Sequence, residues 1–207
     1  MKNLLILGTA VHAVEMVEIV ERVNAARPTW NLLGFVAADT AKVGQELNGY
    51  PVVAVGAHWE GDADALYVPA FGWPESLNPP RERTVALVDP SAWVSRTAVL
   101  GAGCVIYPHC FIGLQARLGD RVFCLSGCII NHDDVLEDSV TLASGVTLAG
   151  GVRVEAGCYL GQASSVRQFL RVGRGSVLGM GCVVVKDVPP NSVMVGNPAR
   201  RLRAREE

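Results

Sequence analysis

An aliphatic residue recurs at every sixth position through the second half of the chain, from Val94 to Val184. Fifteen of the sixteen positions hold Ile, Leu or Val, and no insertion breaks the series. The series is Val94, Leu100, Ile106, Ile112, Leu118, Cys124, Ile130, Leu136, Leu142, Leu148, Val154, Leu160, Val166, Val172, Leu178 and Val184. A coiled coil has a heptad period and a half-buried strand alternates, so neither explains this spacing. The series therefore predicts a repeat architecture.

Small residues accompany the aliphatic positions at a fixed distance. Four residues on, the side chain is mostly small, as at Ala98, Cys104 and Ser164, and glycine often follows the aliphatic directly, as at Gly101. These features predict short parallel strands wound into a three-sided coil of about eighteen residues, with aliphatics inside and small residues at the corners. The sixteen units then form roughly five coils, stacked about 4.8 Å apart.

Residues 1 to about 90 follow a different pattern, typical of an α/β unit. Apolar segments that predict strands lie at 3–7, 32–37, 49–53, 65–70 and 84–88. Valines spaced three apart from Val14 to Val23 predict an amphipathic helix after the first strand, and this order favours a small parallel sheet. Residues 70–83 contain three prolines and predict a loop. We expect an α/β domain at 1–90 and a repeat domain at 91–207.

Charge and hydropathy narrow the possible partners. The formal net charge is −2 and no long basic run occurs, which argues against nucleic acid as the main partner. No run of about 18 consecutive apolar residues occurs, which argues against a membrane span. The N-terminal segment is too short and too charged afterwards for a signal peptide. We therefore expect a cytoplasmic protein.

Six cysteines raise the question of disulfides or a metal site. Five occupy the small position of the repeat, Cys124 occupies an aliphatic position, and no CxxC pair occurs. Free cysteine is among the most frequently buried residue types. We therefore expect all six thiols to be core residues, and we expect no metal.

A polar segment, Asn131 to Asp134, lies inside the repeat. His132 comes two positions after the inward Ile130, so its side chain should leave the coil near a corner. Residues eighteen apart stack on neighbouring coils, which places Gly150 beside His132. Because glycine has no side chain, we expect a thioester to approach there, with backbone N–H groups facing a developing oxyanion.

Two carboxylates follow the histidine. A carboxylate beside imidazole, here Asp133, fixes its tautomer and raises its basicity. Asp134 takes an inward position, where a carboxylate must be hydrogen-bonded. The alternative is a polar turn without a catalytic role, and the repeat context favours the catalytic interpretation.

The repeat resembles the left-handed parallel β-helix of the hexapeptide-repeat acyltransferases, over about 110 residues. Around Ile130-Asn131-His132-Asp133 it resembles sugar acetyltransferases that include sialic-acid O-acetyltransferases and UDP-4-amino-sugar N-acetyltransferases, with Asn131 in place of their usual Glu. The resemblance implies a homotrimer that moves an acetyl group from acetyl-CoA to an amine or hydroxyl of a sugar or nucleotide sugar. It makes His132 the general base and Asp133 its partner.

The same resemblance implies that CoA lies in a groove between subunits, along the later coils and the closing loop. The expected contacts are Thr141, Gly150, Gln162, Met180 and Lys186. Lys186 is expected to meet a phosphate. The segment Gly196–Arg200 is similar to a frequent closing loop of such enzymes, and it also fits a proline-directed turn. Thr141 stands where the family often has a second histidine, which implies altered acyl positioning or another acyl donor.

The N-terminal domain departs from the family pattern. The expected acceptor-binding residues are Gly8, His12, Ala13 and Asp39. However, Ala10 and Val11 replace glycines of the first turn, and Ala37 and Ala38 stand where the family has acids that contact the nucleotide. Nucleotide-sugar binding, another acceptor and a mainly structural domain therefore all stay open.

Two other functional classes remain as alternatives. A γ-type carbonic anhydrase shares the β-helix but needs three histidines for zinc, whereas only His109 and His132 lie in this helix. A non-catalytic β-helical scaffold is favoured by Thr141, Ala37 and Ala38. The sequence leaves the acceptor, and the choice between O- and N-acylation, undetermined.

Overall fold

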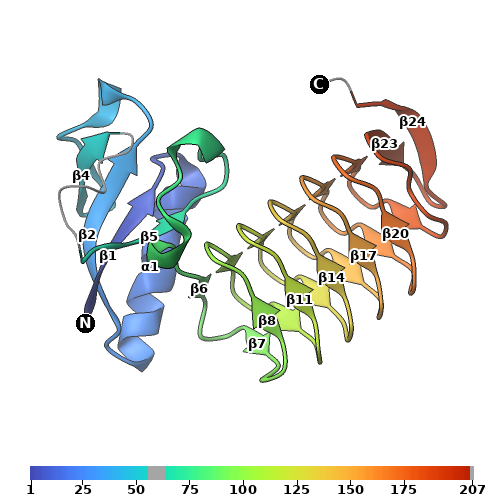
Figure 1. The fold of residues 1–207 in the computed structure, drawn as a ribbon, viewed down its shortest axis with the longest axis horizontal. Helices are drawn as coiled ribbons and strands as arrows, with labels where there is room; N and C mark the ends of the chain where they lie inside the picture. The colour runs from blue at the N-terminus through green and yellow to red at the C-terminus, as the bar shows by residue number, and fades with distance from the viewer. Residues whose placement is uncertain (56–63, 206–207) are drawn as a thin grey trace. The chain divides into compact units, whose positions relative to one another are not determined.

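The computed structural model describes residues 1–55 and 64–205 (Figure 1). The chain forms two compact units, Met1–Pro90 and Ser91–Glu207. In the described residues, no helix has the length and apolarity needed to cross a membrane.

The first unit is built on a five-stranded sheet with the order β3-β4-β2-β1-β5. Its strands are β1 (Lys2–Leu7), β2 (Trp30–Ala37), β3 (Glu46–Leu47), β4 (Tyr50–Val55) and β5 (Leu66–Pro69). All neighbours pair in parallel except β3, which runs antiparallel to β4. The predicted small parallel sheet is therefore confirmed, with one short antiparallel strand added at its edge.

The predicted strand at 84–88 does not join this sheet as a strand. Only Thr84 forms an isolated bridge, to Tyr67, and β6 (Leu87–Val88) lies outside the five strands. The preceding loop contains the short 3₁₀ turns η3 (Glu75–Leu77) and η4 (Arg81–Arg83). A third such turn, η1 (Thr40–Lys42), follows β2. The proline-rich segment is thus a loop, as predicted.

The helix α1 (Val11–Ala26) packs through a stripe of small and aliphatic side chains. Ala13, Met16, Val17 and Val20 are buried, at the i, i+3, i+4 and i+7 spacing of an α-helix. The predicted amphipathic helix is confirmed, and two of its valines, Val17 and Val20, are buried. Val14 and Val23, at the two ends of the valine series, are half-buried, because a spacing of three drifts away from a period of 3.6.

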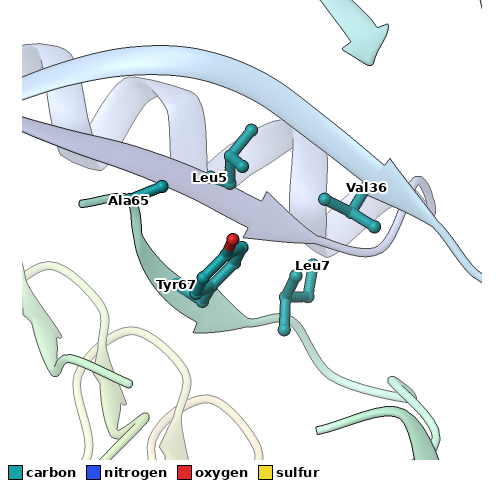
Figure 2. Close-up of a cluster of buried hydrophobic side chains, with 5 residues drawn as sticks. All are labelled: Leu5, Leu7, Val36, Ala65 and Tyr67. Atoms are coloured by element: carbon teal, nitrogen blue, oxygen red, sulfur yellow. The ribbon is translucent and has the colours of Figure 1, made fainter. Parts of the chain in front are cut away.

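Both faces of the sheet are covered. Leu4 and Ile6 alternate with Leu5 and Leu7 along β1, so the two pairs point to opposite faces, and all four are buried. Figure 2 shows the cluster on one face, where side chains from three strands meet. Its members are Leu5, Leu7, Val36, Ala65 and Tyr67.

The second unit is a left-handed β-helix of sixteen two-residue strands, β7 to β22, closed by β23 and β24 (Figure 1). Face 1 contains β7 (Trp93–Val94), β10 (Phe111–Ile112), β13 (Ile129–Ile130), β16 (Thr147–Leu148), β19 (Ser165–Val166) and β22 (Val183–Val184). Face 2 contains β8 (Val99–Leu100), β11 (Arg117–Leu118), β14 (Val135–Leu136), β17 (Arg153–Val154) and β20 (Arg171–Val172). Face 3 contains β9 (Val105–Ile106), β12 (Phe123–Cys124), β15 (Thr141–Leu142), β18 (Tyr159–Leu160), β21 (Val177–Leu178), β23 (Ser192–Val195) and β24 (Arg200–Ala204).

The register of the coils confirms the six-residue reading. Each strand pairs in parallel with the strand eighteen residues on, as Ile112 with Ile130 and Ile130 with Leu148. The repeat aliphatics point inward and are buried from Ile106 to Val184, whereas those of the opening coil are half-buried. All six cysteines are free and buried, as predicted. The core is therefore a continuous column of aliphatic side chains and thiols.

Four-residue corners join the faces, and their third residue is usually in the left-handed region. The corner between faces 1 and 2, called the His132 corner, comprises 113–116, 131–134, 149–152, 167–170 and 185–188. The corner between faces 3 and 1, called the Gln162 corner, includes 161–164 and 179–182. On the His132 corner the third position has φ of 61° at Asp133 and 70° at Gly151.

Candidate functional site

The polar segment Asn131–Asp134 forms one corner turn, between β13 and β14. Backbone hydrogen bonds hold it from both neighbouring coils. The Asp133 N–H donates to the Leu114 carbonyl at 2.9 Å, and the Gly151 N–H donates to the His132 carbonyl at 3.0 Å. The turn therefore has a fixed backbone, and the side chain of His132 starts from a defined position.

Asp134 points into the coil and is fully buried. One carboxyl oxygen accepts from the Asn131 N–H at 2.8 Å, and the other accepts from the Val152 N–H at 2.7 Å. Burial raises the pKa of Asp134 to about 7, against the opposing effect of the two N–H donors. The expectation that an inward carboxylate must be hydrogen-bonded is confirmed, and the side chain ties the turn to the next coil.

His132 and Asp133 form a hydrogen-bonded pair on the outer side of the corner. The imidazole Nδ1 lies 2.8 Å from Oδ2 of Asp133, and the His132 side chain is 60% exposed. An ionised carboxylate only accepts hydrogen bonds, so this contact requires the proton on Nδ1. The lone pair of a neutral His132 is then on Nε2, on the side away from the carboxylate.

The ring of His132 lies over Gly150. A β-carbon at Gly150 would come within 2.5 Å of both Cε1 and Nε2, so any larger residue would displace the imidazole. The predicted stacking of these two residues is therefore correct. The imidazole itself fills the space above the glycine, which differs from the open ledge for a thioester that the sequence led us to expect.

A second ring, Phe169, was missed in the sequence. It occupies the third position of the same corner one coil beyond Gly151, with φ of 59°. A β-carbon at Gly151 would meet its ring at 2.7 Å, so the ring lies against that glycine. The available signal was a bulky aromatic at a position between faces 1 and 2 that otherwise holds Thr, Gln, Asp or Gly.

The expected CoA contacts separate into different parts of one chain. Gly150 and Lys186 share the His132 corner, at intervals of eighteen residues. Gln162 and Met180 stack on the Gln162 corner, on the other side of face 1. Thr141 lies in β15 on face 3. A single chain therefore does not bring all five together.

Lys186 lines a pocket of about 380 Å³ at the far end of the His132 corner. Arg200 and Arg201 of β24 also line it, together with Asp187 and three uncharged residues. Asp187 accepts a hydrogen bond from the Arg171 N–H at 2.9 Å. Three cations against one carboxylate make this pocket suited to an anion such as a phosphate.

The predicted acceptor residues of the first unit differ in their surroundings. Gly8 has φ of 119° in the turn after β1, and His12 pairs through Nδ1 with Glu15 at 2.9 Å. Ala13 is buried in the core of the unit, so its side chain is not at the surface. Asp39 caps the turn η1 by accepting from the Ala41 N–H at 2.9 Å.

Lys42, which the sequence did not single out, reaches the turn that contains Gly8. Its ammonium donates to the Thr9 carbonyl at 3.1 Å, and η1 places it there. In residues 1–55 and 64–205, no group of three or more His, Cys, Asp or Glu side chains is arranged to hold a metal ion. Lys42 therefore lies at the turn between β1 and α1, where His12 is in the first turn of the helix.

Comparison with proteins of known sequence shows similarity to acyltransferases over part of the chain. An acyl-[acyl-carrier-protein]–UDP-N-acetylglucosamine O-acyltransferase of Synechocystis sp. is 33% identical over 88 residues, which are 42% of this chain and 32% of that protein. The corresponding enzyme of Alkalilimnicola ehrlichii is 37% identical over 88 residues, 42% of this chain and 34% of its own length. The chain thus spans about a third of these relatives. No model of a protein family matches it.

Solved structures match the whole chain. A variant of GDP-perosamine N-acetyltransferase from Caulobacter crescentus, in complex with CoA and GDP-perosamine, has a TM-score of 0.84 at 24% identity, covering 98% of both chains. The acetyltransferase domain of PglB from Neisseria gonorrhoeae, in complex with acetyl coenzyme A, has a TM-score of 0.84 at 24% identity and covers 97% and 99%. This likeness establishes the fold, which is the one that the resemblance to hexapeptide-repeat acyltransferases implied.

Proposed function

We propose that this chain transfers an acetyl group from acetyl-CoA to an amine or hydroxyl of a sugar or nucleotide sugar. The observation that carries the proposal is the His132–Asp133 pair, held at a corner of the β-helix with Nε2 directed away from the carboxylate. The similarity to sugar acetyltransferases and to O-acyltransferases adds support from the whole fold.

His132 would act as the general base. Neutral Nε2 takes the proton of the acceptor amine or hydroxyl while that group attacks the thioester carbonyl carbon. The carbon–sulfur bond then breaks, and the coenzyme thiolate leaves and takes up the proton from the imidazolium. Asp133 holds the proton on Nδ1 and stabilises the imidazolium that forms between these steps.

The backbone at Gly150 offers a donor for the developing oxyanion. The Gly151 N–H is already used by the His132 carbonyl, whereas the Gly150 N–H has no acceptor among the described residues. A free backbone N–H beside the base is the arrangement that stabilises a tetrahedral intermediate in acyl transfer. Gly150 would therefore have two roles: its missing side chain leaves space for the imidazole of His132, and its N–H donates a hydrogen bond to the oxyanion.

The coenzyme would bind with its phosphates at the pocket of Lys186, Arg200 and Arg201. Gln162 and Met180 would contact it from a neighbouring copy, since they lie on the other corner of their own chain. This arrangement requires a homotrimer, in which one subunit's His132 corner meets the next subunit's Gln162 corner. Thr141 would then contribute to positioning the acyl group.

The first unit would bind the acceptor at the turn between β1 and α1. Gly8, His12 and Lys42 surround this turn, and Asp39 fixes η1, which carries Lys42. A lysine beside a helix N-terminus suits a phosphorylated acceptor such as a sugar nucleotide. Because acetyl-CoA and sugar nucleotides are cytoplasmic metabolites, we propose that the protein acts in the cytoplasm.

The test is coenzyme release by the purified protein with acetyl-CoA and a panel of amino sugars, nucleotide sugars and small alcohols. The panel also separates N- from O-acylation. With the best acceptor, His132→Ala should lower turnover by about 10² or more while circular dichroism stays unchanged, because it removes only the base. Val99→Ala is the control, since Val99 is exposed on face 2, outside both the His132 corner and the Gln162 corner.

Two outcomes would contradict the proposal. Turnover of His132→Ala close to that of the wild type would remove the proposed base. Absence of turnover with every acceptor, together with no binding of acetyl-CoA, would favour the non-catalytic scaffold instead.

A further inference from the structure

Phe169 combines an unfavourable backbone position with an exposed aromatic ring. Its φ of 59° lies in the left-handed region, which this corner also imposes on Gln115 and Asp133 and which is unfavourable for a bulky residue. Its side chain is also 76% exposed, so it gains little from burial. The free protein therefore gains little stability from this ring, and its apolar surface is available for contact with a bound molecule.

The ring lies in the same turn as the proposed base. Gly150 and Gly151 are consecutive, and the ring of His132 lies over the first while the ring of Phe169 lies against the second. The two rings approach this glycine pair from neighbouring coils on opposite sides, since His132 precedes it by eighteen residues and Phe169 follows it by eighteen. Phe169 therefore borders the approach to Nε2 from the C-terminal coils.

The C-terminal end of the same corner is cationic. Lys186 lies three coils beyond His132, which is about 14 Å at a coil spacing of about 4.8 Å. Gly150 and Gln168 lie between His132 and Lys186 in the same column of stacked corner residues. Phe169 lies beside this column, next to Gln168. A donor that has its phosphates at Lys186 and its thioester at His132 must cross Phe169 with the segment that joins the two ends.

We propose that Phe169 contacts the pantetheine arm of acetyl-CoA and directs its thioester end toward His132, an inference that rests on the proposed function. The arm is the part of the coenzyme that lacks charge and has apolar methyl and methylene groups, so an exposed aromatic ring is a suitable surface for it. Phe169 is then a donor-binding residue that takes no part in proton transfer.

The experiment compares two probes, CoA and 3′,5′-ADP, by isothermal titration calorimetry. The second probe carries phosphates of the coenzyme but has no pantetheine arm. Phe169→Gly should weaken CoA binding about 10-fold, as expected for losing part of an aromatic contact, and leave 3′,5′-ADP binding unchanged. Its melting temperature should not fall, because glycine relieves the left-handed backbone. Phe169→Leu should retain most of the affinity.

The control is Val99→Ala, which removes an exposed apolar side chain from face 2 and should leave binding of both probes unchanged. Equal CoA affinity in Phe169→Gly and the wild type would overturn the inference while leaving the proposed function intact. An equal loss for both probes, or a drop in melting temperature, would indicate a structural role and also overturn it. Failure of the wild type to bind CoA at all would instead refute the proposed function.

Discussion

At the scale of single residues, the corner that presents His132 depends on a carboxylate that never reaches the surface. Asp134 accepts one hydrogen bond from its own turn and one from the next coil. Its side chain therefore fixes the position of the turn relative to that coil. Burial raises its pKa to about 7, and the neighbouring His132 lowers it when charged. The turn is therefore sensitive to pH through a group distinct from the proposed base.

The raised pKa of Asp134 predicts that the folded protein loses stability as the pH rises toward 7. Between about pH 4 and pH 7 the folded protein holds an Asp134 proton that the unfolded chain has released. The contribution of Asp134 to the free energy of unfolding should thus be largest below about pH 4. It should fall by a few kcal/mol as the pH rises to about 7. Asp134→Asn lacks this proton, so urea unfolding should show the wild type losing stability relative to the variant across that window. A difference independent of pH would contradict the assignment.

The contact between Gly150 and His132 can be tested as a coupled pair. Gly150→Ala places a methyl group 2.5 Å from ring atoms of His132, so the imidazole must move and acetyl transfer should fall about 10-fold or more. In the His132→Ala background the same change meets no ring. A double-mutant cycle on unfolding free energy should then show a coupling of about 1 kcal/mol or more between the two positions. Additive effects would mean that the ring does not occupy the space above the glycine.

The sequence predicted these residues to different extents. The stacking of His132 on Gly150 follows from an uninterrupted period, since residues eighteen apart must lie on adjacent coils. The orientation of the imidazole was not predictable, because it depends on a side-chain torsion that the period does not set. Phe169 was missed because the repeat constrains inward positions, whereas Phe169 points outward and differs from the same position of neighbouring coils only in its side chain.

At the scale of elements, the second unit was predictable because one steric rule is repeated sixteen times. Each aliphatic position must face inward, and each corner must fit a small residue. The register of the strands, the number of coils and the burial of the cysteines could therefore all be predicted from the six-residue period. The first unit has no such redundancy. Its parallel strands were predicted from apolar runs, but β3 has only two residues and 84–88 does not form one of the five strands of this sheet. Those details depend on tertiary contacts that a local pattern does not encode.

At the scale of the whole molecule, the proposed site is incomplete in one chain. His132 and the pocket of Lys186 lie on one corner, whereas Gln162 and Met180 lie on another, with face 1 between them. Within a rigid coil these corners cannot approach each other. A closed ring of copies joins unlike surfaces of adjacent subunits, which is how separate corners can form one site. The proposed chemistry therefore requires a neighbouring copy, and we propose that the copies form a homotrimer.

Subunit complementation distinguishes a shared site from one contained in a single chain. His132→Ala removes the base from one corner, and Gln162→Ala with Met180→Glu damages the other corner and adds a charge that repels phosphates. Each variant alone should be inactive. If the two are co-expressed with different tags and purified through both, each mixed trimer should regain about one site in three, because only one of its three interfaces joins an intact His132 corner to an intact Gln162 corner. Analytical ultracentrifugation of the mixture should give the mass of a trimer. If activity stays absent although mixed trimers form, or if the protein is a monomer in solution, then His132 does not act across an interface with the Gln162 corner, and the coenzyme must be held by one chain alone.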